Sequence, residues 1–110
     1  SGLDEIGGSE SVTTYGDRAT IRRAGEMAKM WRLYDFKAPL VFNGKSYMSM
    51  RMQNEYDCQG ERTRTLSLFF HKGNMASGEV VYTTSNPENW EPNSPGTLIQ
   101  TQWEVACGKL

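Results

Sequence analysis

The stretch YMSMRMQNEYDCQGERTRTLSLFFH, residues 47–71, decides the fold. In its first half apolar and polar residues alternate, as is typical of a strand that is buried on one face only. One face carries Met48, Met50, Met52, Tyr56 and Cys58, and the other carries Ser49, Arg51, Gln53, Glu55 and Asp57. We therefore expect a half-buried strand over residues 47–58, a turn at residues 59–61 and a second strand over residues 62–71.

Two registers compete for this hairpin. A two-residue loop sets Asp57 opposite Arg62 and Glu55 opposite Arg64, whereas a three-residue loop aligns Met52 with Leu68 and Met50 with Phe70. Each exposed ion pair is worth only about 0–1 kcal/mol. Each buried apolar side chain is worth roughly 1.5–3 kcal/mol. Burial outweighs the ion pairs, so we expect the three-residue loop, with its glycine near the left-handed position.

Strand signals continue on both sides of this hairpin. Runs rich in Thr, Val, Ile and aromatic residues, bounded by turn residues, indicate strands over residues 11–15, 18–23, 27–36 and 79–84. A turn is expected at Gly16-Asp17, and Pro39 is expected to end the third run because proline cannot donate to the ladder. Residues 40–45 fit either a short hairpin at Asn43-Gly44 or a loop tucked under apolar side chains.

The one helix signal is C-terminal. Ser94 is a good N-cap and Pro95 a good first helical residue. The i, i+4, i+7 positions of an apolar stripe are held by Ile99, Trp103 and Ala106. Gly108 then suits the end of the helix. The expected fold is therefore α+β, with an antiparallel sheet of about six strands and one C-terminal helix packed on one face.

Two of these expected elements each carry one cysteine. Cys58 lies on the apolar face of its expected strand, and Cys107 borders the apolar stripe of the expected helix. If the helix packs on that face, the two sulfurs can meet in a disulfide, which would place the protein in an oxidising compartment. The alternative is two buried free thiols, since cysteine is commonly buried. We favour the disulfide.

Length and charge exclude several classes of protein. A chain of 110 residues is one domain by size, and we take residues 1–10, which show no period, as a flexible leader before a single domain over residues 11–110. The formal net charge of −1 lacks the basic excess of a nucleic-acid binder. The longest apolar run is far short of the roughly 20 residues that a transmembrane helix needs. Two cysteines and one histidine build no zinc site, and we expect no metal or cofactor.

Catalytic chemistry is not indicated. His71 stands at an expected strand end with no nucleophile or orienting acid identifiable by spacing, so we expect a surface or edge histidine. Glu55 and Asp57 point to the same side of one strand, beside several arginines, and we expect a solvated charge ladder rather than a paired-carboxylate site. The sequence therefore predicts no catalytic residues and no enzyme.

Five groups of residues, spread over roughly residues 11–107, carry a family resemblance. They are Tyr15-Gly16-Asp17 with Ile21-Arg22; Trp31-Arg32-Leu33-Tyr34-Asp35-Phe36; Ser46-Tyr47, Ser49 and Tyr56-Asp57-Cys58; Gly78-Glu79-Val80-Val81 with Trp90; and Pro95-Gly96-Thr97 with Cys107. In this order and spacing they resemble the surface-adhesin protein E family of Gram-negative bacteria.

The resemblance implies a six-stranded antiparallel sheet with a C-terminal helix joined to it by a disulfide. It also implies export to the outer membrane or periplasm, often as a lipoprotein, and self-association as a homodimer. Founding members bind host extracellular-matrix and plasma proteins. We expect membrane contact only through a lipid anchor outside these 110 residues, and no nucleic-acid partner.

Candidate contact residues follow from the charge pattern. Arg51, Arg62 and Arg64 are the candidate binding residues, because guanidinium groups make forked bonds to carboxylate and sulfate. A locally basic face would suit acidic host proteins or sulfated glycans, and an ordinary mixed surface is the alternative. The residues expected to have a core or structural role are Trp31, Tyr56, Trp90 and Trp103.

Two functions remain open at this point. The first is a non-catalytic adhesion module of the bacterial cell surface, which binds host matrix or plasma proteins. The second is a periplasmic structural or interaction protein without adhesive activity. Fold alone does not decide between them.

Overall fold

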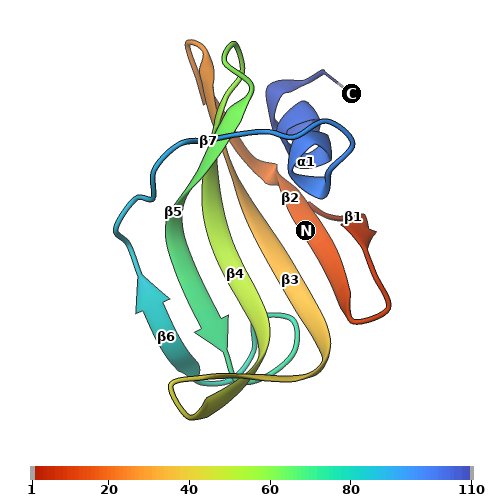
Figure 1. The fold of residues 1–110 in the computed structure, drawn as a ribbon, viewed down its shortest axis with the longest axis vertical. Coiled ribbons are helices and arrows are strands. Elements are labelled where there is room, and N and C mark those ends of the chain that lie inside the picture. Colours follow the sequence, from red (N-terminus) through yellow and green to blue (C-terminus); the bar gives the residue numbers. More distant parts are fainter. Residues whose placement is uncertain (1, 110) are drawn as a thin grey trace.

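The computed structural model describes residues 2–109. Its elements are β1 (Leu3–Gly8), β2 (Val12–Ala24), β3 (Met27–Phe42), β4 (Lys45–Asp57), β5 (Arg62–His71), β6 (Val80–Thr84), β7 (Glu91–Pro92) and α1 (Leu98–Cys107). Strands β1 to β6 form an antiparallel meander in sequence order, and the short β7 pairs with β5 (Figure 1). The predicted α+β fold, a six-strand antiparallel sheet with a C-terminal helix on it, is confirmed.

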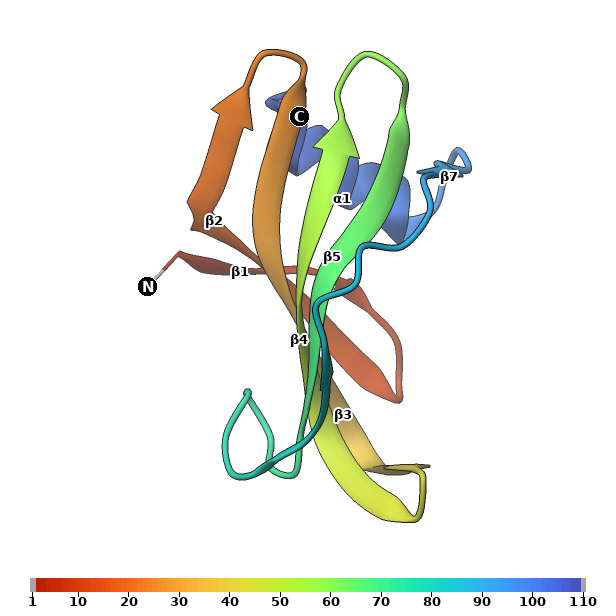
Figure 2. The same ribbon diagram turned by 90° about the vertical axis from the view of Figure 1, so that its left-hand side faces the viewer.

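The helix covers only one end of one sheet face. In Figure 2, α1 lies behind the upper half of the sheet, and the β3–β4 hairpin continues well beyond it. The core between them consists of Ile6, Ala28, Met30, Tyr56, Trp103, Val105, Ala106 and Cys107. We call the sheet face that α1 covers the inner face and the opposite face the outer face. No helix within residues 2–109 combines the length and apolar character needed to cross a membrane.

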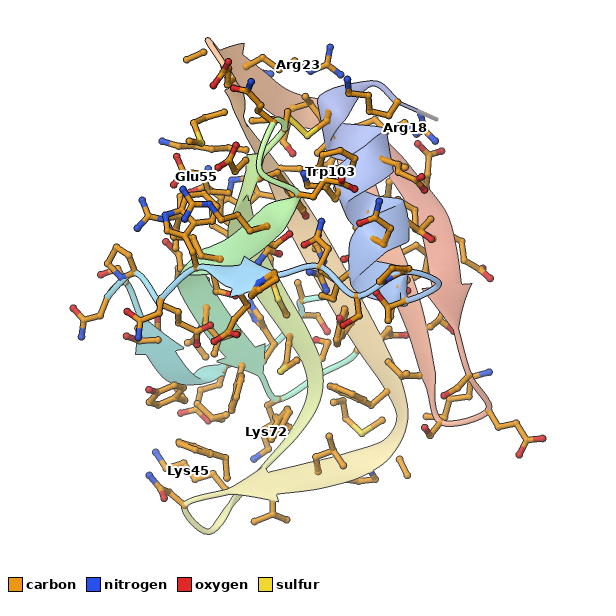
Figure 3. All side chains as sticks on the ribbon, turned by 45° about the horizontal axis from the view of Figure 1, so that its top comes forward. Arg18, Arg23, Lys45, Glu55, Lys72 and Trp103 are labelled. Carbon is orange, nitrogen blue, oxygen red and sulfur yellow. A yellow bond between two sulfur atoms is a disulfide. The ribbon has the colours of Figure 1, made fainter. Side chains whose placement is uncertain are left out.

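Three contacts fix the helix to the sheet near the β4–β5 turn. Cys58 and Cys107 form a disulfide with their Cα atoms 5.6 Å apart, which confirms the bonded alternative. Trp103, only 5% exposed, lies between α1 and the sheet, and its ring N–H donates to the carbonyl oxygen of Asp57 at 2.8 Å (Figure 3). Arg23 on β2 donates from Nε to the carbonyl oxygen of Ala106 at 3.0 Å.

The hairpin of β4 and β5 uses both registers that the sequence offered. Near the turn, Asp57 pairs with Arg62 and Glu55 with Arg64, so the predicted three-residue loop is wrong there. The register then shifts between Gln53 and Asn54. Beyond this β-bulge the predicted apolar alignments are correct, with Met52 opposite Leu68 and Met50 opposite Phe70. One extra residue in β5 thus satisfies the ion pairs at one end and burial at the other.

Three predicted boundaries are wrong on the N-terminal side. Gly16-Asp17 is no turn but lies within the continuous strand β2, where Gly16 is buried and a Cβ would lie 2.6 Å from Ile6 Cδ1. Close packing, rather than a bend, explains this glycine. Residues 3–8 of the expected flexible leader form β1, which pairs with β2 and buries Ile6 in the core. Strand β3 continues past Pro39, which lies where the pairing with β4 is interrupted and no ladder donor is required.

Other boundaries differ at the turns. Residues 40–45 form a tight hairpin, with Asn43 at φ 50° and Gly44 at φ 76°, as two-residue turns of this kind require. The helix starts later than predicted: its N-cap is Thr97, whose hydroxyl accepts the Gln100 N–H at 3.3 Å. Gly96 has φ 75°, which is outside the helical region, so the helix cannot begin at Ser94. The predicted end at Gly108 is confirmed by its left-handed conformation, φ 70°.

Aromatic side chains cover the part of the inner face that the helix does not reach. At the far end of the inner face, the rings of Tyr47 and Phe70 stack with centroids 4.4 Å apart. Phe42 and Tyr82 add a contact of 4.6 Å, and Phe36 meets Tyr47 edge-on at 5.9 Å. This cluster covers the end of the sheet that α1 leaves free, and it holds the long β3–β4 hairpin against β5 and β6.

We expect Trp103→Ala to lower the free energy of unfolding by roughly 3–5 kcal/mol, as loss of a large core aromatic does. Trp103→Phe should cost less, since it keeps most of the apolar contact and loses the hydrogen bond to Asp57, worth about 0.5–1.5 kcal/mol. Urea unfolding of the two variants and the wild type measures both losses of unfolding free energy. Equal midpoints for wild type and Trp103→Ala would show that α1 contributes little to the fold.

Candidate functional site on the outer face of the sheet

The three arginines singled out by the sequence share the outer face. Tyr56 is buried under α1, so its neighbours in β4 at alternate positions, Glu55 and Asp57, point away from the helix. Residues paired across strands lie on the same side. Arg62 and Arg64 therefore join Asp57 and Glu55 on the outer face, and Arg51 lies on it farther along β4. We call Arg51, Arg62, Arg64, Trp31, Phe69 and Trp90 the outer arginine face.

Arg51 lies over two aromatic rings. Its guanidinium carbon is 4.8 Å from the centroid of Trp31 and 4.5 Å from that of Phe69. The first ring comes from β3 and the second from β5, so three adjacent strands build this stack. A hollow of about 130 Å³ opens beside it, lined by Leu3, Asp17, Trp31, Arg32, Leu33, Arg51, Met75 and Ala76. Arg51 forms no ion pair within residues 2–109.

Arg62 and Arg64 share a third aromatic ring. Their guanidinium carbons lie 4.8 and 4.7 Å from the centroid of Trp90, which belongs to the segment between β6 and β7. Arg62 Nε is 2.8 Å from Asp57 Oδ2, and an Arg64 guanidinium nitrogen is 2.7 Å from Glu55 Oε1. These pairs form the predicted charge ladder, but its acids are largely buried rather than solvated, because the side chains of Asp57 and Glu55 are only 10% and 13% exposed. Stacking and pairing together hold both guanidinium groups in fixed orientations.

The residues expected to have a core or structural role divide between the two faces. Tyr56 and Trp103 are buried beneath α1, with 0% and 5% of their surface exposed. For Trp31 and Trp90 the structure excludes the core role and leaves the structural one, because both are half-buried on the outer face and lie outside the core. They are platforms for arginine side chains, because a strand's alternate positions face opposite sides and Trp31 falls on the side away from α1.

Asp57 links the outer face to the turn. Its Oδ1 accepts the backbone N–H groups of Gly60 at 2.9 Å and Gln59 at 3.2 Å, while Oδ2 accepts from Arg62. The bond from Gly60, followed by the one from Arg62, lowers the pKa of the Asp57 carboxyl. The carboxylate is therefore ionised at neutral pH, and it fixes the turn and Arg62 at the same time.

His71 is buried at the end of β5, whereas the sequence predicted a surface or edge histidine. It lies on the outer face with 7% of its surface exposed. The loop after β5 folds over this end of the sheet, where the Ser49 hydroxyl donates to the carbonyl oxygen of Gly73 at 2.6 Å and accepts the Ala76 N–H at 3.0 Å. Desolvation, and then the positive charge of Arg51, lower the pKa of His71.

The described residues offer no metal site on this face. Nowhere in residues 2–109 do three His, Cys, Asp or Glu side chains gather in a group that could hold a metal ion. What the outer arginine face provides is a set of oriented guanidinium groups on aromatic platforms, which suits recognition of carboxylate or sulfate groups on a partner.

The sequence matches a family model described as surface-adhesin protein E over residues 3–108. The chain belongs to the surface-adhesin protein E family. The match begins at the first residue of β1 and ends just after α1, so the matched region spans every strand and the helix of this chain. The resemblance inferred from the sequence is thereby confirmed. No curated protein matches the sequence.

Solved structures of protein E from Haemophilus influenzae share this family's fold with the chain. One superimposes with a TM-score of 0.77 at 13% identity and covers 98% of this chain and 85% of that chain. A second, from a non-typeable strain, gives a TM-score of 0.72 at 15% identity and covers 96% of this chain and 76% of that one. At such identities the likeness establishes the protein E fold, and the ligands are a separate question.

Sequence analysis missed several buried polar residues on the inner face. Arg32 and Asn54 are each 2% exposed, and Gln102 is fully buried. A signal was present, since Asn54 interrupts the apolar alternation between Met52 and Tyr56. Gln102 sits likewise within the buried face of α1. These interruptions point to polar chemistry beneath the helix side of the sheet.

We expect protein stability to depend on pH through His71. Because the folded-state pKa is lowered, the neutral imidazole is favoured by folding. Its contribution is fully present above the unfolded pKa of about 6.5 and is lost as pH falls toward the lower folded value. The urea midpoint should therefore decrease between roughly pH 7.5 and pH 5. In His71→Gln the decrease should be smaller, and an equal decrease would mean that His71 is not the group responsible.

Proposed function

We propose that this protein is a non-catalytic adhesion module of the bacterial cell envelope, which binds host matrix or plasma proteins. The observation that supports this most is the family membership, because the family is one of surface adhesins. The partner class, the surface location and the contact residues are part of the proposal. A lipid anchor outside these 110 residues would hold the module at the membrane.

The outer arginine face is the proposed contact surface. Its side chains are already oriented by ring stacking, so binding would cost little side-chain entropy. Arg51 supplies an unpaired positive charge, because it forms no ion pair with any acid within residues 2–109. Arg62 and Arg64 are balanced by Asp57 and Glu55 and would act mainly through directed hydrogen bonds. Carboxylate-rich protein segments or sulfated glycans fit such a surface.

Binding to immobilised vitronectin, laminin and heparin tests the proposal. We expect binding to at least one of the three, weaker at about 1 M than at about 0.1 M salt as the Debye length falls from roughly 10 to 3 Å. The triple variant Arg51→Gln, Arg62→Gln, Arg64→Gln should lose at least about tenfold in affinity, which corresponds to about 1.4 kcal/mol. Gln is preferable to Glu here, since Glu would add repulsion beside Glu55 and Asp57.

Arg18→Gln is the matched control. Arg18 is an exposed arginine of β2, paired with Asp4 at 2.8 Å, and lies well apart from Glu55 in Figure 3. It should bind as the wild type does. Undiminished binding by the triple variant would reject the outer arginine face as the contact. Absence of binding to all three probes would favour a periplasmic structural protein.

A further inference from the structure

A groove of about 380 Å³ opens on the inner face, between the start of α1 and the segment before it. Its floor is formed by residues of β3, β4 and β5, and residues 88–97 form the wall at the β5 edge of the sheet. That wall is fixed to β5: the Glu88 N–H donates to Thr65 O at 2.9 Å, the Asn93 N–H to Glu61 O at 2.9 Å, and the Thr63 hydroxyl to Asn93 Oδ1 at 2.8 Å. The groove is therefore a formed feature of the fold.

Arg32 lines this groove and is 2% exposed. Buried arginines ordinarily face a carboxylate, because an unpaired charge is costly away from water. Within residues 2–109, Arg32 forms no ion pair. Only neutral side chains accept from it: one terminal nitrogen donates to Asn54 Oδ1 at 2.9 Å, and the other to the Tyr34 hydroxyl. Its Nε has no acceptor among the described residues.

The partners of Arg32 are themselves fixed. The Asn54 amide nitrogen donates to Thr65 Oγ1 at 3.0 Å and to Arg64 O at 3.3 Å, which leaves Oδ1 turned to the guanidinium. Nearby, Tyr56 is fully buried, and burial raises the pKa of its phenol to about 12, partly offset by the Arg32 charge. The phenol is therefore neutral and cannot serve as the missing anion. The guanidinium is therefore held in place without a carboxylate in contact with it among the described residues.

We propose that this groove is a binding site for a small carboxylate with an apolar body, whose carboxylate pairs with Arg32. A planar carboxylate matches the guanidinium fork and would accept its unused N–H groups. Tyr34, Met52 and Ile99 line the groove and would contact the apolar body. This proposal does not rest on the proposed adhesion. Arg64 belongs to the outer arginine face and also lines the groove, but Arg32, on which the proposal depends, points to the opposite side of the sheet from Arg51, Arg62 and Arg64.

Two acids decide which anions fit. Glu88 and Glu91 also line the groove and are exposed, whereas Arg64, the other arginine of the lining, is already paired with Glu55. The two exposed acids would repel a strongly charged, strongly hydrated anion more than a singly charged carboxylate. Sulfate should therefore bind more weakly than an organic carboxylate. Glu88→Gln with Glu91→Gln should strengthen carboxylate binding, most clearly at low salt.

Titration of the wild-type protein with 3-phenylpropanoate, followed by NMR, tests the site. We expect saturable shifts of the Arg32 Nε–H and the Asn54 side-chain amide, and a rise in melting temperature. The neutral analogue 3-phenylpropanamide has the same body without the charge and should bind at least about tenfold more weakly. Equal binding of acid and amide, or no shift at Arg32 with the acid, would overturn the proposal. Sulfate tests whether charge alone is sufficient, and sulfate binding as tight as the acid would also overturn it.

Two variants separate the site from the fold. Arg32→Met removes the charge and should lose the binding and the ligand-induced rise in melting temperature. Ser94→Trp leaves Arg32 intact and fills the groove from its exposed wall, so this variant should also lose binding. If Arg32→Met does not fold, Ser94→Trp still tests the site. Arg18→Gln is again the matched control and should bind normally. Wild-type binding by folded Arg32→Met or Ser94→Trp would contradict the proposal.

Discussion

The docking of one short helix on one end of the sheet determines the rest of this structure. A ten-residue helix is marginal alone, and α1 is stabilised by what it buries. Its C-terminal end is fixed by the Cys58–Cys107 disulfide and by the hydrogen bond from Trp103 to Asp57 O, both at the β4–β5 turn. Because α1 covers only this end, the remaining inner face is closed by aromatic rings, and a groove is left between the helix and the residues before it.

Asp57 connects the two faces of the sheet. Its carbonyl oxygen accepts from the helix on the inner side, while its carboxylate holds the turn and Arg62 on the outer side. The same strand therefore sets the position of α1 and the orientation of an arginine platform.

The sequence predicted the parts of the fold that local pattern controls. The alternation of apolar and polar residues predicted β4 and its inner face, and the apolar stripe predicted α1. The two cysteines on those faces predicted the disulfide. It missed features that depend on distant neighbours. Gly16 resembles a turn residue in the sequence. In the structure a glycine is needed there because the side chains of Ile6 and Met30 leave no room for a Cβ atom, and these two residues approach it only after folding. The β4–β5 register needed a bulge because ion pairs and burial favoured different alignments. Among candidate residues, Arg51, Arg62 and Arg64 were found together on one face, but Trp31 and Trp90 lie outside the core, and the inward direction of Arg32 was overlooked.

The most direct test of the central role of α1 docking is hydrogen exchange of the helix amides before and after removal of the disulfide. The two cysteines are 49 residues apart, and the chain-entropy model assigns about 4 kcal/mol to a loop of this length. With Cys58→Ser and Cys107→Ser together, we expect the amides of α1 to lose protection first, while those of β3 and β4 stay the more protected. Unchanged protection of α1 in this variant would contradict the account, because the helix would then be held to the sheet without the bond at its C-terminal end.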